Sequence, residues 1–211
     1  MSRGRVVAVV AVVGGLLLAV GILIGRLGAP TAAAPSTDSA AAGFLRDMQV
    51  HHAQAVQMAL LVRDRTDDET LRTIAYDMAV TQAGQSGAMY GLLEAWDLPQ
   101  ASPSPPMTWT QLPTIDGSSG GGHQMDPSAP AGMPGMATTA QITALEAATG
   151  DEAVRLFLEL MIDHHLGGLE MAEAVLARTD VPQVLDLARG IARAQQAEVD
   201  LMRGMLAALP S

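Results

Sequence analysis

Two adjacent histidines with methionines on either side occur twice in the chain, in the stretches FLRDMQVHHAQAVQMA and FLELMIDHHLGGLEMA. Imidazole nitrogens bind zinc, copper, iron or nickel, whereas the thioether sulfur of methionine is soft and selects copper(I). The pattern therefore predicts a metal site that favours copper(I), with zinc as an alternative if only the histidines bind. The candidate ligands are Met48, His51, His52, Met58, Met161, His164, His165 and Met171.

The same residues also fit a helical core that holds no metal. A single histidine on an apolar helix face is most often a hydrogen-bonded core residue, and a methionine stripe most often fills gaps in packing. Four imidazoles in or near one core would each need a hydrogen-bond partner or a metal ion, because burying an unpaired polar group costs free energy. The repetition of the histidine pair at one position in both copies favours the metal-ligand interpretation.

Further residues could support or supplement these ligands. Gln82 and Gln195 are repeated and central to an apolar helical stripe, where they could orient the imidazoles or bound water, or hydrogen-bond a helix backbone or each other. Met89 and Met202 lie on the same stripes. A last group lies between the two copies and could supply mobile ligands, although the composition of a loose linker explains it almost as well: Met107, His123, Met125, Met133 and Met136.

The two histidine motifs belong to a longer internal repeat, in which residues 44–96 align without a gap on residues 157–209. Each copy is broken near its middle by turn-forming and cap-forming residues, at RDRTDDE and at ARTDVPQ. We therefore expect each copy to be a helical hairpin, and the two hairpins to form an all-α four-helix bundle. Equal sequences present equal apolar faces, so we expect the hairpins to pack about a pseudo-twofold axis.

Composition divides the chain around the hairpins. Residues 31–40, rich in Ala, Pro, Ser and Thr, are predicted to be a flexible tether, and residues 41–211 are predicted to be the bundle domain. Within that domain a Pro/Gly/Met-rich linker at residues 97–137 separates hairpins at residues 44–96 and 151–209. The linker is too long for an ordinary bundle connection and is predicted to be loop or disorder.

Capping signals predict where several helices begin. Thr66 with Glu69 predicts a capping box at the start of the second helix of the first hairpin. The stretch TTAQ predicts a short helix that begins after Thr138. Gly150 and Asp151 are typical of a helix stop followed by a new N-cap.

The first part of the chain, residues 1–30, is predicted to be a signal anchor or signal peptide with a transmembrane helix. Residues 6–25 carry no charge and are long enough to cross the core of a bilayer. Arg3 and Arg5 precede them, which places the rest of the chain on the extracytoplasmic side. The stretch APTAAAP offers cleavage sites, so a secreted or periplasmic form is the alternative to a membrane-anchored one.

Charge and cysteine content exclude several classes of protein. The 22 acidic residues outnumber the 12 basic ones and give a net charge of −10, which argues against a nucleic-acid partner and favours a cation. The chain has no cysteine, so it can form neither a disulfide nor a thiolate metal site. A homodimer stays possible.

At its two histidine motifs the chain resembles the domain of unknown function 305 family, whose pattern of Phe-Leu, Met, His-His and Met-Ala occurs twice. The resemblance covers residues 40–209 and includes GMPGM and the specific stretch MIDHHLGGLEMA. It implies a ferritin-like four-helix arrangement, an exported protein, copper binding in some members, and the same eight histidines and methionines as ligands. Gln49 stands where the family pattern is apolar, whereas the second copy keeps Ile162, so we expect the first site to be more solvated.

Three functions compete for this sequence. The favoured one is an extracytoplasmic copper-binding protein for copper homeostasis or resistance, and the alternative is a structural or partner-binding bundle without a metal. A di-iron oxidase of the ferritin-like type would need a carboxylate from each of two helices and two Glu-x-x-His motifs. No Glu precedes a His by three residues in this chain, so we expect no enzyme.

Overall fold

The computed structural model describes residues 34–117 and 132–209. The predicted transmembrane segment at residues 6–25, together with His123 and Met125, lies outside the described residues. Among the helices that are described, none is both long and apolar enough to cross a membrane.

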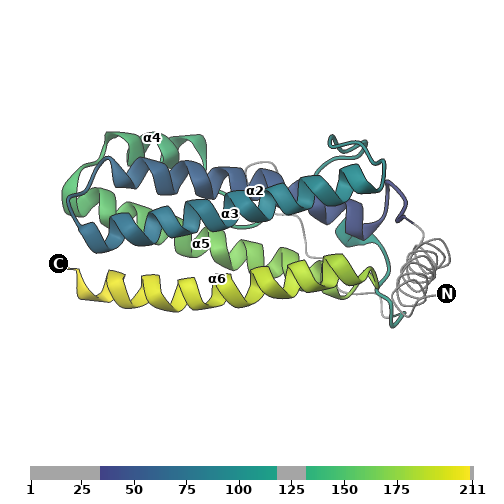
Figure 1. Ribbon diagram of the computed structural model, residues 1–211. Coiled ribbons are helices and arrows are strands. Elements are labelled where there is room, and N and C mark those ends of the chain that lie inside the picture. Colours follow the sequence, from purple (N-terminus) through teal and green to yellow (C-terminus); the bar gives the residue numbers. More distant parts are fainter. Residues whose placement is uncertain (1–33, 118–131, 210–211) are drawn as a thin grey trace, which may run out of the picture. The chain divides into compact units, whose positions relative to one another are not determined.

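The described residues form five α-helices and one short 3-10 helix, without a strand. The helices are α2 (Ala40–Arg63), α3 (Glu69–Ala95), η1 (Thr108–Gln111), α4 (Thr139–Ala147), α5 (Gly150–Leu176) and α6 (Pro182–Ala208). Helix α2 packs against α3 and α5 packs against α6, and the two hairpins meet mainly through α2 and α5 (Figure 1). The prediction of an all-α fold built from two helical hairpins is confirmed.

The two central helices of the bundle, α2 and α5, each bury one face along their whole length. On α2 the buried residues include Phe44, Met48, His51, Ala55, Met58 and Val62. Their equivalents on α5 are also buried, namely Phe157, Met161, His164, Gly168, Met171 and Val175. Because these residues recur every three or four positions, they form one stripe on each helix, and the two stripes meet in the core.

The central helices run antiparallel. The residues at the start of α2, such as Phe44, share a buried cluster with residues from the end of α5, such as Val175. Residues from the end of α2, such as Val62, share the other cluster with Phe157 near the start of α5. Equivalent positions of the repeat therefore exchange places across the interface, as a pseudo-twofold axis requires.

Helix starts follow the predictions in part. The capping box at Thr138 is confirmed, because its hydroxyl accepts from the backbone N–H of Gln141. The predicted box of Thr66 with Glu69 is wrong. Asp68 caps α3 instead, since its carboxylate accepts from two backbone N–H groups of the first turn, while the Thr66 hydroxyl accepts from the N–H of Asp68.

The start of α5 also differs from its prediction, which placed a stop at Gly150 and a cap at Asp151. Gly150 is instead the first residue of the helix, with a φ of 58° that suits glycine. Its N–H donates to the carbonyl of Arg65 at 2.7 Å. This contact between the hairpins is a non-local reason for the unusual helix start.

The beginning of the predicted linker is held against α2. The Asp47 carboxylate is buried and accepts from the indole N–H of Trp109 at 2.8 Å and from the backbone N–H of Met107 at 2.7 Å. The Trp109 ring lies over Gly43, where any Cβ would overlap with the indole. Burial raises the pKa of the Asp47 carboxyl.

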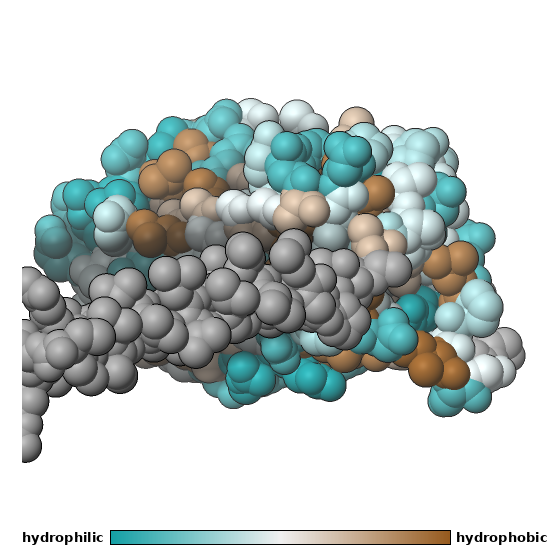
Figure 2. Space-filling view, turned by 45° about the vertical axis from the view of Figure 1, so that its right-hand side comes forward, coloured by the Kyte–Doolittle hydropathy of each residue, from teal (hydrophilic) through white to brown (hydrophobic). Residues whose placement is uncertain are grey.

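The histidines and methionines of the repeated pattern lie below the surface. The face seen in Figure 2 carries hydrophilic residues with small groups of hydrophobic ones between them. The exposed large hydrophobic residues, which include Val50, Tyr76, Val80 and Ile115, are not among the candidate ligands.

Candidate metal centre

The four repeated histidines come together in one buried layer between α2 and α5. All four are 0% exposed. The rings of His51 and His164, which occupy the same position in the two repeats, have centroids 3.7 Å apart and planes tilted by 33°. His165 lies beside them, with its ring centroid 6.3 Å from that of His164. Residues that are far apart in the sequence thus form a single polar layer in the core, which we call the histidine layer.

Three of these imidazoles are held by an acceptor on the Nε2 side. His52 Nε2 lies 2.8 Å from Gln85 Oε1 on α3, and His165 Nε2 lies 2.7 Å from Glu198 Oε2 on α6. His51 Nε2 lies 3.1 Å from the carbonyl oxygen of Pro134. Because a carbonyl or carboxylate oxygen can only accept, Nε2 of His51 and of His165 donates the proton in these contacts, whereas the tautomer of His52 depends on the orientation of the Gln85 amide.

The opposite sides of the rings have no hydrogen-bond partner. Five buried imidazole nitrogens in the described part of the chain are unpaired: Nδ1 of His51, His52 and His165, and both ring nitrogens of His164. An unpaired buried polar atom costs about 1–3 kcal/mol. Bare lone pairs in a buried layer are the donor set that a metal ion needs, so these residues fit a metal.

Burial also favours the neutral form of three of the imidazoles, those of His51, His52 and His164. It lowers the pKa of His51 to about 3 and that of His52 to about 4, and it lowers the pKa of His164 well below its usual value. Neighbouring imidazoles lower the values further. These histidines can therefore bind a metal near neutral pH without first losing a proton.

The candidate methionines lie in two groups, above and below the histidine layer along the bundle. Met48, Met89 and Met171 share one buried cluster, and all three are 0% exposed. Their repeat equivalents are buried to the same degree in the other cluster, namely Met161, Met202 and Met58. The antiparallel packing of α2 and α5 explains the division, because it brings the methionine before one histidine pair to the methionine after the other.

The imidazoles and carboxylates alone do not form a ready site. Within residues 34–117 and 132–209, no three His, Asp or Glu side chains lie in an arrangement that could hold a metal ion. A metal in the histidine layer therefore needs thioether ligands as well, or a rotation of the rings.

The two glutamines predicted to support the ligands lie in the core but do not hydrogen-bond an imidazole. Gln82 and Gln195 are each 2% exposed, and neither amide has a hydrogen-bond partner. The Gln195 amide packs on Gly168, where a Cβ would overlap with it. The imidazoles are held instead by Gln85 and Glu198, three residues further along the same helix stripes. The sequence places these two on the same stripes but does not identify them as partners of the imidazoles, because they differ in type between the copies.

A segment just before α4 covers the histidine layer. The Pro134 carbonyl of this segment contacts His51. The segment also packs closely on α5 at two glycines, of which one lies in the segment and the other in α5. A Cβ at Gly135 would overlap with the carbonyl of Asp163, and one at Gly167 would overlap with the carbonyl of Pro134. The stretch GMPGM therefore packs over the layer at His51, and Gly135 of this stretch together with Gly167 of α5 permits the close approach.

The methionines predicted as mobile ligands are packed where the structure describes them. Met133 is 0% exposed in the cluster that contains Met48, and Met136 is half-buried against that cluster. Met107, 3% exposed, belongs to the same cluster.

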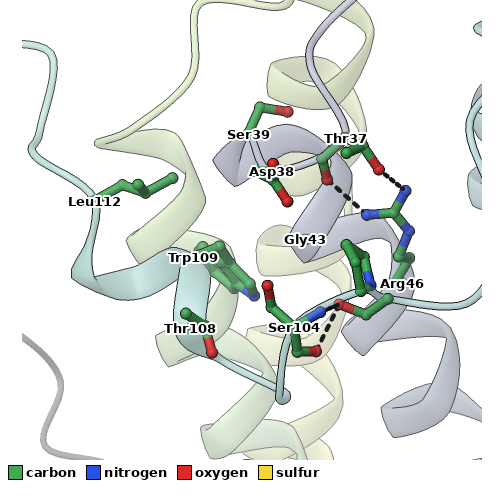
Figure 3. Close-up of a pocket in the computed structure, with 11 residues that line it drawn as sticks. Thr37, Asp38, Ser39, Gly43, Arg46, Ser104, Thr108, Trp109 and Leu112 are labelled. Carbon is green, nitrogen blue, oxygen red and sulfur yellow. Dashed lines mark hydrogen bonds between the residues drawn. The ribbon is translucent and has the colours of Figure 1, made fainter.

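A separate pocket opens on the surface near the start of α2. It has a volume of about 150 Å³ and is lined by residues that include Asp38, Arg46, Ser104 and Trp109 (Figure 3). The Arg46 guanidinium is occupied by hydrogen bonds to Thr37 and to the carbonyl of Pro99. None of the candidate ligands lines this pocket, so it is distinct from the histidine layer.

Comparison with known proteins agrees with the all-α fold. A model of the family described as domain of unknown function (DUF305) matches residues 41–206. The crystal structure of a DUF305 protein from Streptomyces coelicolor, assigned as secreted, is 45% identical with a TM-score of 0.71, and the match covers 82% of this chain and 94% of that one. A DUF305 fragment from Deinococcus radiodurans is 30% identical with a TM-score of 0.60, covering 79% and 94% of the two chains.

A more distant structure shares the fold. CopM in its Cu(I)-bound form is 21% identical with a TM-score of 0.55, covering 77% of this chain and 91% of that one. Its Cu(II)-bound form is 22% identical with a TM-score of 0.59, covering 80% and 96%. No curated protein shows significant similarity to the chain.

The metal-free bundle should lose stability as the pH falls from about 7.5 to about 5.5. An unfolded histidine has a pKa near 6.5, whereas burial lowers the pKa of His51 to about 3 and that of His52 to about 4. In this window the unfolded chain therefore binds protons that the folded chain does not bind. The free energy of unfolding is highest above pH 6.5 and decreases as the pH falls below this value. Urea unfolding should show a loss of roughly 1 kcal/mol per buried histidine.

The matched control replaces His51, His52 and His164 with Gln. Its unfolding free energy should change much less over the same pH range, because glutamine does not titrate. A parent protein with a profile as flat as that of the control would contradict the buried, neutral state of the histidines.

Proposed function

Since the chain belongs to the DUF305 family, we propose that its helical bundle binds a metal ion in the histidine layer and that the metal is copper. The observation that carries the proposal is the set of unpaired, buried imidazole nitrogens of His51, His52, His164 and His165. The ion would be the protein's cargo, held for copper homeostasis or resistance.

The chemistry of the donor set favours copper over zinc. Zinc would need three or four histidines or carboxylates around one ion, and no such arrangement occurs in the described part of the chain. The buried methionines on both sides of the layer can complete a site with thioether sulfur, which selects copper(I). CopM, which has the same fold, has been solved with Cu(I) and with Cu(II), and this supports copper as the first metal to test.

The charge of the ligands also suits a monovalent ion. Imidazole and thioether groups are neutral, so these ligands do not neutralise the charge of an ion bound in the buried layer. The desolvation cost of an ion rises steeply with its charge. Copper(I) is therefore easier to accommodate here than a divalent ion.

In the proposed site His51, His52, His164 and His165 supply nitrogen ligands. The thioethers of Met48, Met58, Met161 and Met171 supply sulfur, and Met89 and Met202 complete the two methionine groups. The competing proposal of a bundle without a metal leaves the imidazole nitrogens unpaired, at a cost of about 1–3 kcal/mol for each.

We further propose that the bundle works on the extracytoplasmic side, anchored through residues 1–30, with release after signal cleavage as the alternative. The Streptomyces coelicolor relative is assigned as secreted, which supports export. Methionine suits an oxidising compartment because it binds copper(I) without deprotonation and cannot be lost to a disulfide.

The first prediction from this proposal separates sulfur ligands from nitrogen ligands. Replacing Met48, Met58, Met161 and Met171 together with Leu nearly conserves core volume, so the fold should survive at a cost below about 1.5 kcal/mol per site. Copper(I) affinity should fall at least about tenfold, equivalent to ~1.4 kcal/mol, because leucine has no lone pair. Competitive titration against a copper(I) chelator measures the change.

Two further variants serve as comparisons. Met205→Leu removes a half-buried thioether of α6 that packs against the cluster containing Met202 but is not a proposed ligand, and it should bind copper(I) like the parent. Replacing all four histidines of the layer with Gln should weaken copper(II) and zinc binding as well, since imidazole binds all three ions. If the fourfold Met→Leu variant keeps the parent's copper(I) affinity and stoichiometry, the thioethers only pack and the proposed ligand set is wrong.

The second prediction concerns location. A full-length chain with a C-terminal tag should sediment with membranes and be digested by protease added from outside, because residues 6–25 carry no charge and follow Arg3 and Arg5. A soluble product that begins within APTAAAP would show that cleavage replaces anchoring. A tag that resists external protease would contradict export.

A further inference from the structure

The two halves of the histidine layer differ in the residue that holds the outer imidazole. Gln85 and Glu198 occupy the same position of the repeat, as His52 and His165 do. The contact from His52 Nε2 to Gln85 Oε1 is 2.8 Å, and that from His165 Nε2 to Glu198 Oε2 is 2.7 Å. The geometry is conserved between the halves while the charge of the partner is not.

A carboxylate constrains an imidazole more strictly than an amide does. An ionised Glu198 can only accept, so it requires the proton of His165 to lie on Nε2 and leaves Nδ1 as a bare lone pair in the buried layer. The Gln85 amide can turn and present its NH₂ group, which permits either tautomer of His52. Nδ1 of His165 is therefore available to a metal ion without a change of tautomer, whereas Nδ1 of His52 can carry the proton.

The carboxylate also brings charge to a layer that otherwise lacks it. Among the described residues, Glu198 is the one carboxylate that hydrogen-bonds a histidine. Its side chain is 23% exposed, whereas that of His165 is 0% exposed. Glu198 can thus keep its own charge partly solvated while its negative field reaches the buried ring, and this offsets the cost of placing a cation among neutral ligands.

We propose that Glu198 is a positioning residue that makes the half of the layer around His165 the stronger metal-binding half. The proposal rests on the proposed function of copper binding. Glu198 would act through His165, without touching the metal, by fixing its tautomer and by supplying a counter-charge.

The repeat provides matched variants for the test. Glu198→Gln gives the second half the amide of the first, and it should lower copper(I) affinity about tenfold in a competitive titration. Gln85→Glu gives the first half a carboxylate and should raise the affinity. The double variant, Gln85→Glu with Glu198→Gln, moves the carboxylate to the equivalent place and should restore most of the parent's affinity.

Glu159→Gln controls for net charge, because it removes the same charge from an exposed position of α5. It should leave copper(I) affinity unchanged. The proposal is overturned if Glu198→Gln binds copper(I) as tightly as the parent, or if Glu159→Gln loses as much affinity as Glu198→Gln does.

A second readout does not involve a metal. Nitrogen NMR shifts of the metal-free protein should show His165 protonated on Nε2 in the parent, and a mixture of tautomers in Glu198→Gln. If the parent binds no copper, the proposed function fails, and the tautomer of His165 still decides the positioning claim. A His165 ring protonated on Nδ1 in the parent overturns it.

Discussion

The packing of α2 on α5, which places the His51 ring against the His164 ring in the buried core, is the constraint on which the rest of the structure depends. Unpaired imidazole nitrogens cost about 1–3 kcal/mol each, and the described part of the layer contains five of them. Each fully buried methionine or phenylalanine contributes about 1.5–3 kcal/mol in the opposite direction. The burial of a methionine group on either side of the layer therefore offsets the free-energy cost of the unpaired nitrogens. The thioethers of the same side chains can bind a soft metal.

The internal repeat made the fold predictable. A gapless match of two segments requires two similar hairpins, and the spacing of Phe44, Met48 and His51 identified the face that α2 buries. The same spacing predicted that the histidine pairs border the core. It could not predict that they would meet at a ring distance of 3.7 Å, because that depends on how one hairpin is placed against the other.

The features that sequence reasoning missed are specific polar contacts between segments that are far apart in the sequence. Asp47 holds Trp109 of the predicted linker, the Pro134 carbonyl holds His51, and Glu198 holds His165 where the first copy has Gln85. Each is a single polar contact between segments that are far apart in the sequence, so the hydrophobic periodicity of a helix does not predict it. These contacts also make the two halves of the bundle unequal.

We propose that copper(I) is bound by imidazole nitrogen and thioether sulfur together. X-ray absorption spectroscopy of the copper(I)-loaded protein tests it most directly, because nitrogen and sulfur neighbours scatter differently at the copper edge. The first coordination shell should contain both imidazole nitrogen and sulfur, and the sulfur contribution should be lost when Met48, Met58, Met161 and Met171 are replaced with Leu. A shell of nitrogen and oxygen alone in the parent protein would contradict it.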